Sequence, residues 1–194
     1  MDAEARMAMD FMAPAEGHPI VDMSCGSGLF TREFLDSGKY PQVVAADFSE
    51  NMLRQTDQFL REKGTRGLDR VALVRDDVAR MPFETGSVRA VHAGAAIHCW
   101  PNPLAALGEI SRVLAPGGVL VASTFMVPTA PLEDFLGEDL VRPLAALAKN
   151  SPEQSSYRWW EERELRQICE AVGLTGFRRN RSNRFIMFSA TKPE

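Results

Sequence analysis

Short apolar segments alternate with segments of helical periodicity along this chain, and that alternation constrains its fold more than any other feature. Five apolar segments are expected to form strands, namely Pro19–Asp22, Val43–Asp47, Val71–Arg75, Val88–Ala93 and Val119–Phe125. Helices are expected at Leu29–Ser37, Ser49–Lys63, Leu104–Leu114 and Glu162–Val172. A parallel pair of strands needs a long crossover connection, usually a helix. The alternation therefore predicts an α/β fold with a parallel sheet and helices on both of its faces.

The last part of the chain departs from this alternation. The strand-like runs Gly176–Asn180 and Arg184–Thr191 are separated by three residues and are expected to pair antiparallel at one edge. With the five earlier strands they give a seven-stranded sheet, mostly parallel with one antiparallel edge strand. Pro116–Gly118 is expected to be a turn. We expect all 194 residues to form one domain, with a variable substrate-side insertion at about 126–160 that contains a helix at Leu136–Lys149.

Composition excludes several classes of protein. The chain has 45% hydrophobic and 25% charged residues, as ordinary globular domains have, and no apolar run long enough to span a membrane. Its net charge of -4 disfavours a nucleic-acid partner, because phosphate binding needs excess positive charge. The three cysteines, Cys25, Cys99 and Cys169, suggest neither a disulfide framework nor a metal site, so a soluble protein of a reducing compartment is expected.

A glycine-containing turn follows the first strand directly. The sequence VDMSCGSGLF places Gly26 and Gly28 between the strand and the first helix. Glycine permits positive φ and close approach of a ligand to the backbone, and a helix N-terminus offers unpaired amide donors. A tight strand-to-helix turn can also require glycine for local reasons alone. The turn by itself is therefore a weak sign of a nucleotide site.

An acidic residue at the end of the second strand strengthens that sign. Asp47 lies about 20 residues after the turn, where a carboxylate can accept hydrogen bonds from ribose hydroxyls. Phe48 beside it could pack on an adenine ring or in the core. A dinucleotide fingerprint would have glycine where Thr31 stands, which argues against an NAD-dependent oxidoreductase, and no triphosphate-binding Gly-Lys-Ser/Thr motif occurs. The pattern favours a cofactor with adenosine and no phosphates.

The ordered motifs resemble those of class I S-adenosylmethionine-dependent methyltransferases. They are VDMSCGSGLF, VVAADFSENML, LVRDDVARMPF, AVHAGAAIHCW and LAPGGVLVAST, and they cover about residues 20–125. The segments CGSGLF and AGAAIHCWPNP resemble, more narrowly, uncharacterised methyltransferases of plant and algal chloroplasts. The resemblance implies a Rossmann-like fold, S-adenosyl-L-methionine as cofactor with S-adenosyl-L-homocysteine as product, and a cytoplasmic or chloroplast location. It also implies that part of an N-terminal lid is missing, because the family usually has more helical sequence before the first strand.

The resemblance assigns the first loop to the methionine part of the cofactor. The loop residues concerned are Asp22, Ser24, Cys25, Gly26 and Gly28. The family more often has glycine at the position of Ser24, which here offers an extra hydroxyl. Asp47 would hold the ribose and Phe48 would lie against the adenine.

The later motifs complete the implied cofactor site. Asp77 would accept a hydrogen bond from the adenine amino group, and the amide of Val78 would serve a ring nitrogen. Ala93 and Gly94, after the fourth strand, would offer backbone groups to the methionine amino group. No metal is expected.

Residues near the expected cleft could complete the chemistry. A sulfonium is already an activated methyl donor, so the protein has mainly to align donor and acceptor and exclude water. His98 could act as general base or be structural, and His92 is expected to be a core residue. The aromatic residues near the cleft could wall an apolar acceptor or fix the following helix to the sheet, and they are Trp100, Tyr157, Trp159 and Trp160. The run FRRNRSNR could bind an anion, although a charged edge hairpin explains it as well.

Two functions of different class remain. The first is in-line methyl transfer to a small, lipophilic acceptor, and the second is a cofactor-binding module without catalysis that acts through a partner. The ordered cofactor motifs favour the enzyme. The acceptor, the acceptor atom and the oligomeric state stay open at this point.

Overall fold

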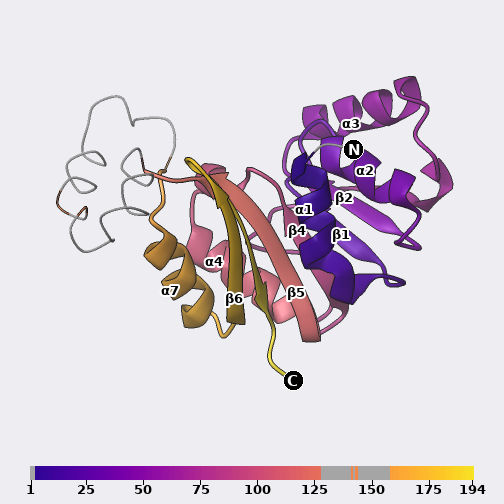
Figure 1. The fold of residues 1–194 in the computed structure, drawn as a ribbon. Coiled ribbons are helices and arrows are strands. Elements are labelled where there is room, and N and C mark those ends of the chain that lie inside the picture. Colours follow the sequence, from indigo (N-terminus) through magenta and orange to yellow (C-terminus); the bar gives the residue numbers. More distant parts are fainter. Residues whose placement is uncertain (1–2, 128–140, 142, 144–157) are drawn as a thin grey trace.

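The structure is a computed structural model, and it describes residues 3–127, 141, 143 and 158–194 (Figure 1). The helix predicted at Leu136–Lys149 and most of the insertion predicted at 126–160 lie outside the described residues. So does Tyr157.

Seven strands form one sheet in the order β3-β2-β1-β4-β5-β7-β6 (Figure 1). They are β1 (Ile20–Met23), β2 (Val43–Asp47), β3 (Val71–Arg75), β4 (Val88–Ala93), β5 (Leu114–Phe125), β6 (Thr175–Ser182) and β7 (Phe185–Thr191). β7 pairs antiparallel with both β5 and β6, and every other pair is parallel. This confirms the predicted mostly parallel, seven-stranded sheet. The strand that runs against the others is β7, which lies one position inside the edge strand β6.

Helices cover both faces of the sheet, as predicted. The helices are α1 (Ala3–Met12), α2 (Leu29–Ser37), α3 (Glu50–Glu62), α4 (Pro103–Val113) and α7 (Glu162–Ala171), with short 3-10 turns η1 (Ala13–Ala15), η2 (Leu68–Arg70) and η3 (Ile97–Cys99). Residues of α1, α2 and α3 share one hydrophobic cluster, and residues of α4 and α7 share another. Successive residues of β4 and β5 alternate between the two clusters, because strand side chains point to opposite faces in turn. None of the helices in the described residues has both the length and the apolar character needed to cross a bilayer.

Local signals in the sequence account for most element boundaries. The Ser49 hydroxyl accepts a hydrogen bond from the Met52 amide and caps α3, while Gly38 ends α2 in the left-handed conformation. The turn predicted at Pro116–Gly118 is wrong, because these residues lie within β5. Val88 of β4 pairs with Leu114 of β5, and Ala90 of β4 pairs with Val119 of β5. β5 therefore has more residues than β4 between these two pairs, and they form an irregularity within a continuous strand.

The N-terminal helix α1 was not predicted. Its buried residues, Ala5, Ala8, Met9 and Met12, are small or flexible, so its apolar pattern is weak in the sequence. It packs on β5 and β7. The middle of the sheet is thereby covered on the face opposite α4.

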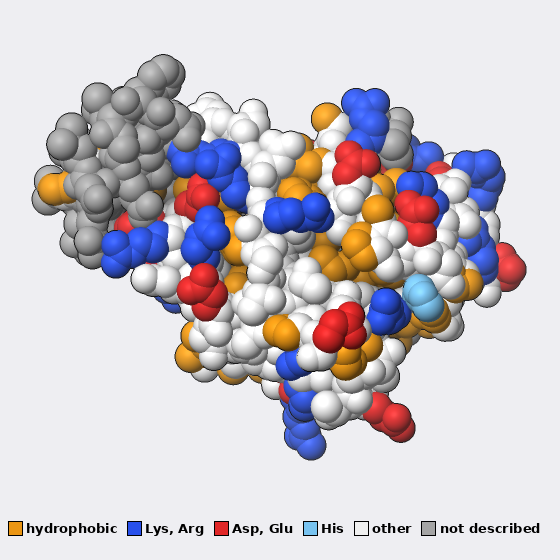
Figure 2. Space-filling model, turned by 60° about the horizontal axis from the view of Figure 1, so that its bottom comes forward, with side chains coloured by type: hydrophobic (Ala, Val, Ile, Leu, Met, Phe, Trp, Pro, Cys, Tyr) orange, Lys and Arg blue, Asp and Glu red, His pale blue; other side chains and the backbone are white. Residues whose placement is uncertain are grey.

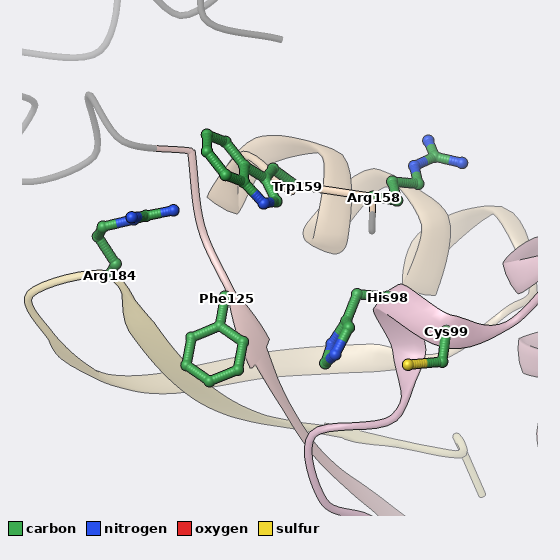
Figure 3. A pocket seen from close by; sticks show the side chains of 6 residues that line it. All are labelled: His98, Cys99, Phe125, Arg158, Trp159 and Arg184. Atoms are coloured by element: carbon green, nitrogen blue, oxygen red, sulfur yellow. The ribbon is translucent and has the colours of Figure 1, made fainter. Parts of the chain in front are cut away.

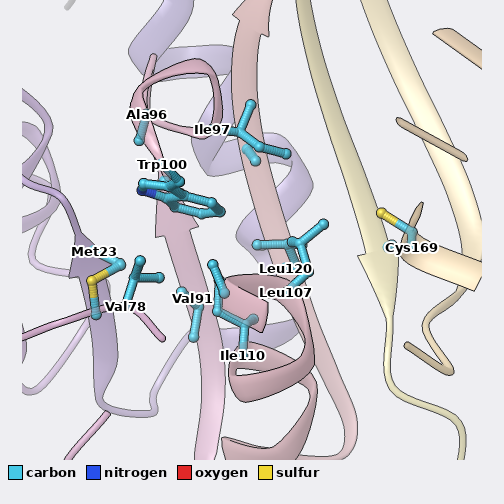
Figure 4. Close-up of a cluster of buried hydrophobic side chains, with 14 of the residues drawn as sticks. Met23, Val78, Val91, Ala96, Ile97, Trp100, Leu107, Ile110, Leu120 and Cys169 are labelled. Carbon is cyan, nitrogen blue, oxygen red and sulfur yellow. The ribbon is translucent and has the colours of Figure 1, made fainter. Parts of the chain in front are cut away.

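The cluster on the α4 face is the larger of the two (Figure 4). Leu107 and Ile110 of α4 lie against Val91 and Leu120 of the central strands, and all four are fully buried. Trp100 extends this cluster toward the carboxyl ends of the strands. The core therefore reaches up to the edge of the sheet where ligands bind in folds of this kind.

We expect Leu107→Ala to lower the free energy of unfolding by about 2 to 5 kcal/mol, because it leaves a cavity in a packed core. Leu104→Ala on the same helix is the matched control. Its side chain is 52% exposed, whereas that of Leu107 is fully buried, and the expected change is within about 0.5 kcal/mol. Urea unfolding measures both, and similar losses in the two variants would contradict this account of the core.

Candidate functional site

A cavity of about 520 Å³ lies at the carboxyl ends of β1, β2 and β4. It is lined by Ser24, Gly26, Asp47, Phe48, Met52, Asp76, Asp77, Val78, Ala95, Ala96, Cys99, Trp100 and Pro101. Six residues expected at a cofactor site are therefore brought together, namely Ser24, Gly26, Asp47, Phe48, Asp77 and Val78. Five others are not among the lining residues, and they are Asp22, Cys25, Gly28, Ala93 and Gly94.

The Asp47 carboxylate forms hydrogen bonds to the turn after β1 and to the start of α3, and it lines this cavity. Its Oδ2 accepts a hydrogen bond from the Gly26 amide at 3.0 Å, and its Oδ1 accepts one from the Ser49 amide at 2.9 Å. From α3, the Thr56 hydroxyl donates to the Gly26 carbonyl at 2.8 Å. Each carboxylate oxygen can still accept a further hydrogen bond from a ligand. Asp47 thus positions the glycine turn and also presents acceptor capacity to the cavity.

The two glycines of the turn serve different purposes. Gly26 has φ +58°, and a Cβ added there would meet no atom within 4 Å, so its backbone is open to a ligand. Gly28 has φ +88°, and a Cβ there would lie 2.7 Å from Cγ2 of Thr56. Gly28 is therefore required for the packing of α3 on the turn. Of the two glycines, Gly26 is the one that lines the cavity.

Two other residues at the cavity hold a conformation that side chains rarely adopt. Ser24 has φ +56° and Ala95 has φ +48°. The Trp100 indole donates to the Ser24 hydroxyl at 3.1 Å, and the Ser123 hydroxyl accepts from the Ala95 amide at 2.8 Å. Strained backbone of this kind concentrates at functional sites, where surrounding contacts maintain it. The Ser24 side chain is thus held in place by Trp100.

A buried polar network supports the turn from below. Asp22 is 1% exposed and accepts hydrogen bonds from the Thr31 hydroxyl at 2.5 Å and from His92 Nδ1 at 2.8 Å. His92 is fully buried against Phe30 and Phe34, in agreement with the predicted core role. These contacts fix the end of β1 and the start of α2 relative to β4.

The remaining predicted residues are not among those that line the cavity, and most of their contacts are with other parts of the protein. A Cβ on Gly94 would lie 2.8 Å from both Phe30 and His92, and Ala93 is fully buried. The Cys25 thiol lies 3.7 Å from the Thr56 hydroxyl, and burial raises the pKa of this thiol to about 12. These residues shape the cavity wall through packing.

Asp76 is a cavity residue that the sequence analysis missed. It is 6% exposed, and its Oδ2 has no hydrogen-bond partner among the residues that the structure describes. Burial raises the pKa of Asp76 to about 6, and the nearby carboxylates of Asp77 and Glu109 add to this rise. Asp77 is exposed, and its Oδ1 accepts from the Ala79 amide at 3.0 Å. The sequence signal that could have identified Asp76 was the pair of adjacent aspartates after β3. In the structure, an unsatisfied buried carboxylate oxygen indicates a position where a ligand could donate a hydrogen bond.

A second cavity of about 600 Å³ adjoins the first (Figure 3). It is lined by His98, Cys99, Phe125, Arg158, Trp159 and Arg184. Cys99 lines both cavities, so they share a wall. His98 Nδ1 lies 3.1 Å from the Thr124 hydroxyl, and burial lowers the pKa of this imidazole. His98 therefore stays largely neutral at pH 7, in the form that accepts a proton.

The aromatic residues expected near the cleft divide between two roles. Trp159 lines the second cavity, whereas Trp160 is 1% exposed and forms a bridge with Met126 beside the sheet. Trp100 lines the first cavity and hydrogen-bonds to Ser24. Trp100 and Trp159 therefore lie at cavity walls, whereas Trp160 lies in the packed interior beside the sheet.

Arginines of the β6–β7 hairpin contact the protein itself. Arg179 Nε lies 2.9 Å from Glu162 Oε2 of α7, and Arg178 lies over the Phe11 ring at 5.5 Å from its centroid. On the face shown in Figure 2, basic and acidic side chains are interspersed. These contacts fit the interpretation of the arginine run as a charged edge hairpin. Among the described residues, no group of three or more metal-ligating side chains occurs.

Comparison with known sequences gives consistent matches. A family model described as a methyltransferase domain matches residues 21–122. An uncharacterized chloroplastic methyltransferase of Arabidopsis thaliana is 46% identical over 195 residues, which are 99% of this chain and 52% of that protein. A demethylmenaquinone methyltransferase of Staphylococcus aureus is 30% identical over 184 residues, 89% of this chain and 74% of that protein. The chain spans about half the length of the Arabidopsis relatives it matches.

Solved structures share the fold at low sequence identity. A SAM-dependent methyltransferase of Methanosarcina mazei aligns with TM-score 0.69 and 18% identity over 96% of this chain and 97% of that one. Phosphoethanolamine N-methyltransferase 2 of Haemonchus contortus, in complex with S-adenosyl-L-methionine, aligns with TM-score 0.72 and 15% identity over 97% of this chain and 53% of that one. At these identities the likeness shows the fold alone.

We expect Gly28→Ala to lower the free energy of unfolding by about 2 kcal/mol or more, because steric overlap with Thr56 adds to the cost of positive φ. Gly38→Ala is the control, since Gly38 has φ +68° and open space around it. Adding Thr56→Ser, which removes Cγ2 and keeps the hydroxyl, should recover part of the Gly28→Ala loss. Equal losses for Gly28→Ala and Gly38→Ala in urea unfolding would show that the contact with Thr56 is unimportant.

Proposed function

The chain belongs to the methyltransferase domain family, and on that premise we propose that it transfers the methyl group of S-adenosyl-L-methionine to a small, lipophilic acceptor. The observation that carries this proposal is the pair of adjoining cavities. The first contains the glycine turn and aspartates, and the second is walled by aromatic rings and His98. Because the two cavities share Cys99, ligands in them would lie next to each other.

The residues of the first cavity suit this cofactor. Asp47 accepts hydrogen bonds from the ribose hydroxyls, and the Phe48 ring, which is 67% exposed, packs on the adenine. Asp77 accepts a hydrogen bond from the adenine amino group, and the Val78 amide donates one to a ring nitrogen. The unsatisfied oxygen of Asp76 gives a further acceptor for a ligand donor.

Charge also supports the assignment. Three aspartates line the first cavity, and within the described part of the chain no Lys, Arg or His does. Carboxylates favour a ligand that carries positive charge and hydroxyl donors, and they disfavour one with phosphates. When bound, S-adenosyl-L-methionine supplies a positively charged sulfonium with a transferable methyl group.

The second cavity supports a lipophilic acceptor. Phe125 and Trp159 offer apolar walls, and relatives named demethylmenaquinone methyltransferase are consistent with an acceptor of this character. His98 accepts a proton from the acceptor where the reaction requires one, and the Thr124 hydroxyl orients its ring. We assign acceptor specificity to the 126–160 segment, because Arg158 and Trp159 at its described end line this cavity. The chloroplastic relatives support a chloroplast location.

Calorimetric titration of S-adenosyl-L-homocysteine tests the cofactor site. We expect binding by the unmodified chain, and about tenfold weaker binding by Phe48→Ala, because stacking of an aromatic side chain on a base contributes about 1 to 3 kcal/mol. Leu29→Ala is the control, since Leu29 is 49% exposed and lies outside the cavity lining. NADH should not bind. Absence of S-adenosyl-L-homocysteine binding, or equal affinity in Phe48→Ala, would contradict the proposed site.

Transfer of radiolabelled methyl groups to a chloroplast lipid extract tests catalysis. We expect His98→Gln to lower the rate by about 10² to 10⁴ if proton removal is part of the reaction. Burial lowers the pKa of His98 below its usual 6.5. The rate of the unmodified chain should therefore rise with pH through that lowered value and stay level above it, and His98→Gln should lose this acid limb. Cofactor binding without any transfer would instead favour the non-catalytic module.

A further inference from the structure

We propose that the acceptor is a planar aromatic acid whose carboxylate is bound by Arg184, at the end of the second cavity away from Cys99. This inference rests on the proposed function, because it takes the second cavity to be the acceptor site. It adds a residue that determines specificity and a chemical class of substrate.

The two adjoining cavities have opposite charge. Among the described residues, the first is lined by Asp47, Asp76 and Asp77 with no cationic side chain, whereas the second is lined by Arg158 and Arg184 with no carboxylate. Two ligands of opposite charge would thus be favoured side by side.

Arg184 is held at this cavity without an acidic partner. Its guanidinium stacks over Trp159, 4.6 Å from the ring centroid, and its Nε donates to the Met126 carbonyl at 3.4 Å. Among the described residues no carboxylate forms an ion pair with Arg184, in contrast to Arg112 with Glu109 at 2.7 Å and Arg179 with Glu162 at 2.9 Å. A half-buried guanidinium with both terminal nitrogens available favours a planar, bidentate anion such as a carboxylate.

The position of Arg184 gives the bound acceptor a direction. Figure 3 shows Arg184 on the side of the cavity opposite His98 and Cys99, with Trp159 and Phe125 between them. Cys99 marks the side of the cofactor cavity. An acceptor with its acidic group at Arg184 would therefore present its other end to His98 and to the methyl donor.

The walls between these two ends suit a flat ring. Trp159 and Phe125 are aromatic, and Phe125 is 45% exposed despite its size. Aromatic side chains favour offset or edge contacts with a bound ring. Arg158 is the weaker candidate for the anion, because it is exposed to solvent, whereas Arg184 is half-buried, and because in Figure 3 it extends away from the centre of the cavity.

A pair of isosteric probes tests this inference by calorimetry. The probes are 2-naphthoate and 2-naphthamide, which share a ring system and differ in charge. We expect the unmodified chain, saturated with S-adenosyl-L-homocysteine, to bind 2-naphthoate at least about tenfold more tightly, because charge-assisted hydrogen bonds are roughly twice as strong as neutral ones. Arg184→Gln (R184Q) should abolish the preference. Arg178→Gln (R178Q), an exposed arginine on the neighbouring strand β6, should retain it.

The inference is overturned if the unmodified chain binds the two probes equally or binds neither, or if the preference survives in R184Q. The comparison of probes on the unmodified chain does not depend on whether R184Q folds. Titration of S-adenosyl-L-homocysteine in the same samples separates this inference from the proposed function. A naphthoate preference without cofactor binding would refute the methyltransferase proposal and support the anion site at Arg184. Cofactor binding without the preference would support the methyltransferase proposal and refute the anion site.

Discussion

The hydrogen bonds of one carboxylate hold the candidate site together. Asp47, at the end of β2, accepts from the amide of Gly26 in the β1–α2 turn and from the amide of Ser49 at the start of α3. These two turns form adjacent parts of the cavity floor, and Thr56 adds a third link from α3 to Gly26. The cavity therefore depends on parallel pairing of β1 and β2, which brings the two turns to the same edge of the sheet.

The sequence predicted the sheet well, because strand and helix ends depend on local signals, and six of the predicted site residues line one cavity. Strands β2, β3 and β4 begin and end where apolar runs do, and Ser49 and Gly38 mark helix ends through chemistry within one turn. The methyltransferase resemblance is confirmed by the family match over residues 21–122. The helix α1 was missed because small residues supply most of its buried face.

The sequence could not predict which way each motif residue faces. Asp22 belongs to the same motif as Gly26, yet its carboxylate points to His92 and Thr31 in the interior. A Cβ on Gly28 would meet Thr56 of α3, and a Cβ on Gly94 would meet Phe30 of α2, so both glycines are confined by residues distant in the chain. Likewise, Asp76 and Asp77 are adjacent in sequence, but only Asp76 is buried. Such differences arise from tertiary packing, which spacing along the chain does not encode.

Cys99 forms part of the wall of both cavities, and this shared wall has a thermodynamic consequence. A ligand that displaces Cys99 or the η3 turn in one cavity changes the shape of the other. Any resulting change in affinity is reciprocal, because the coupling free energy between two sites is the same from either side. A shared wall of this kind makes the η3 turn the place where occupancy of one cavity would be felt in the other.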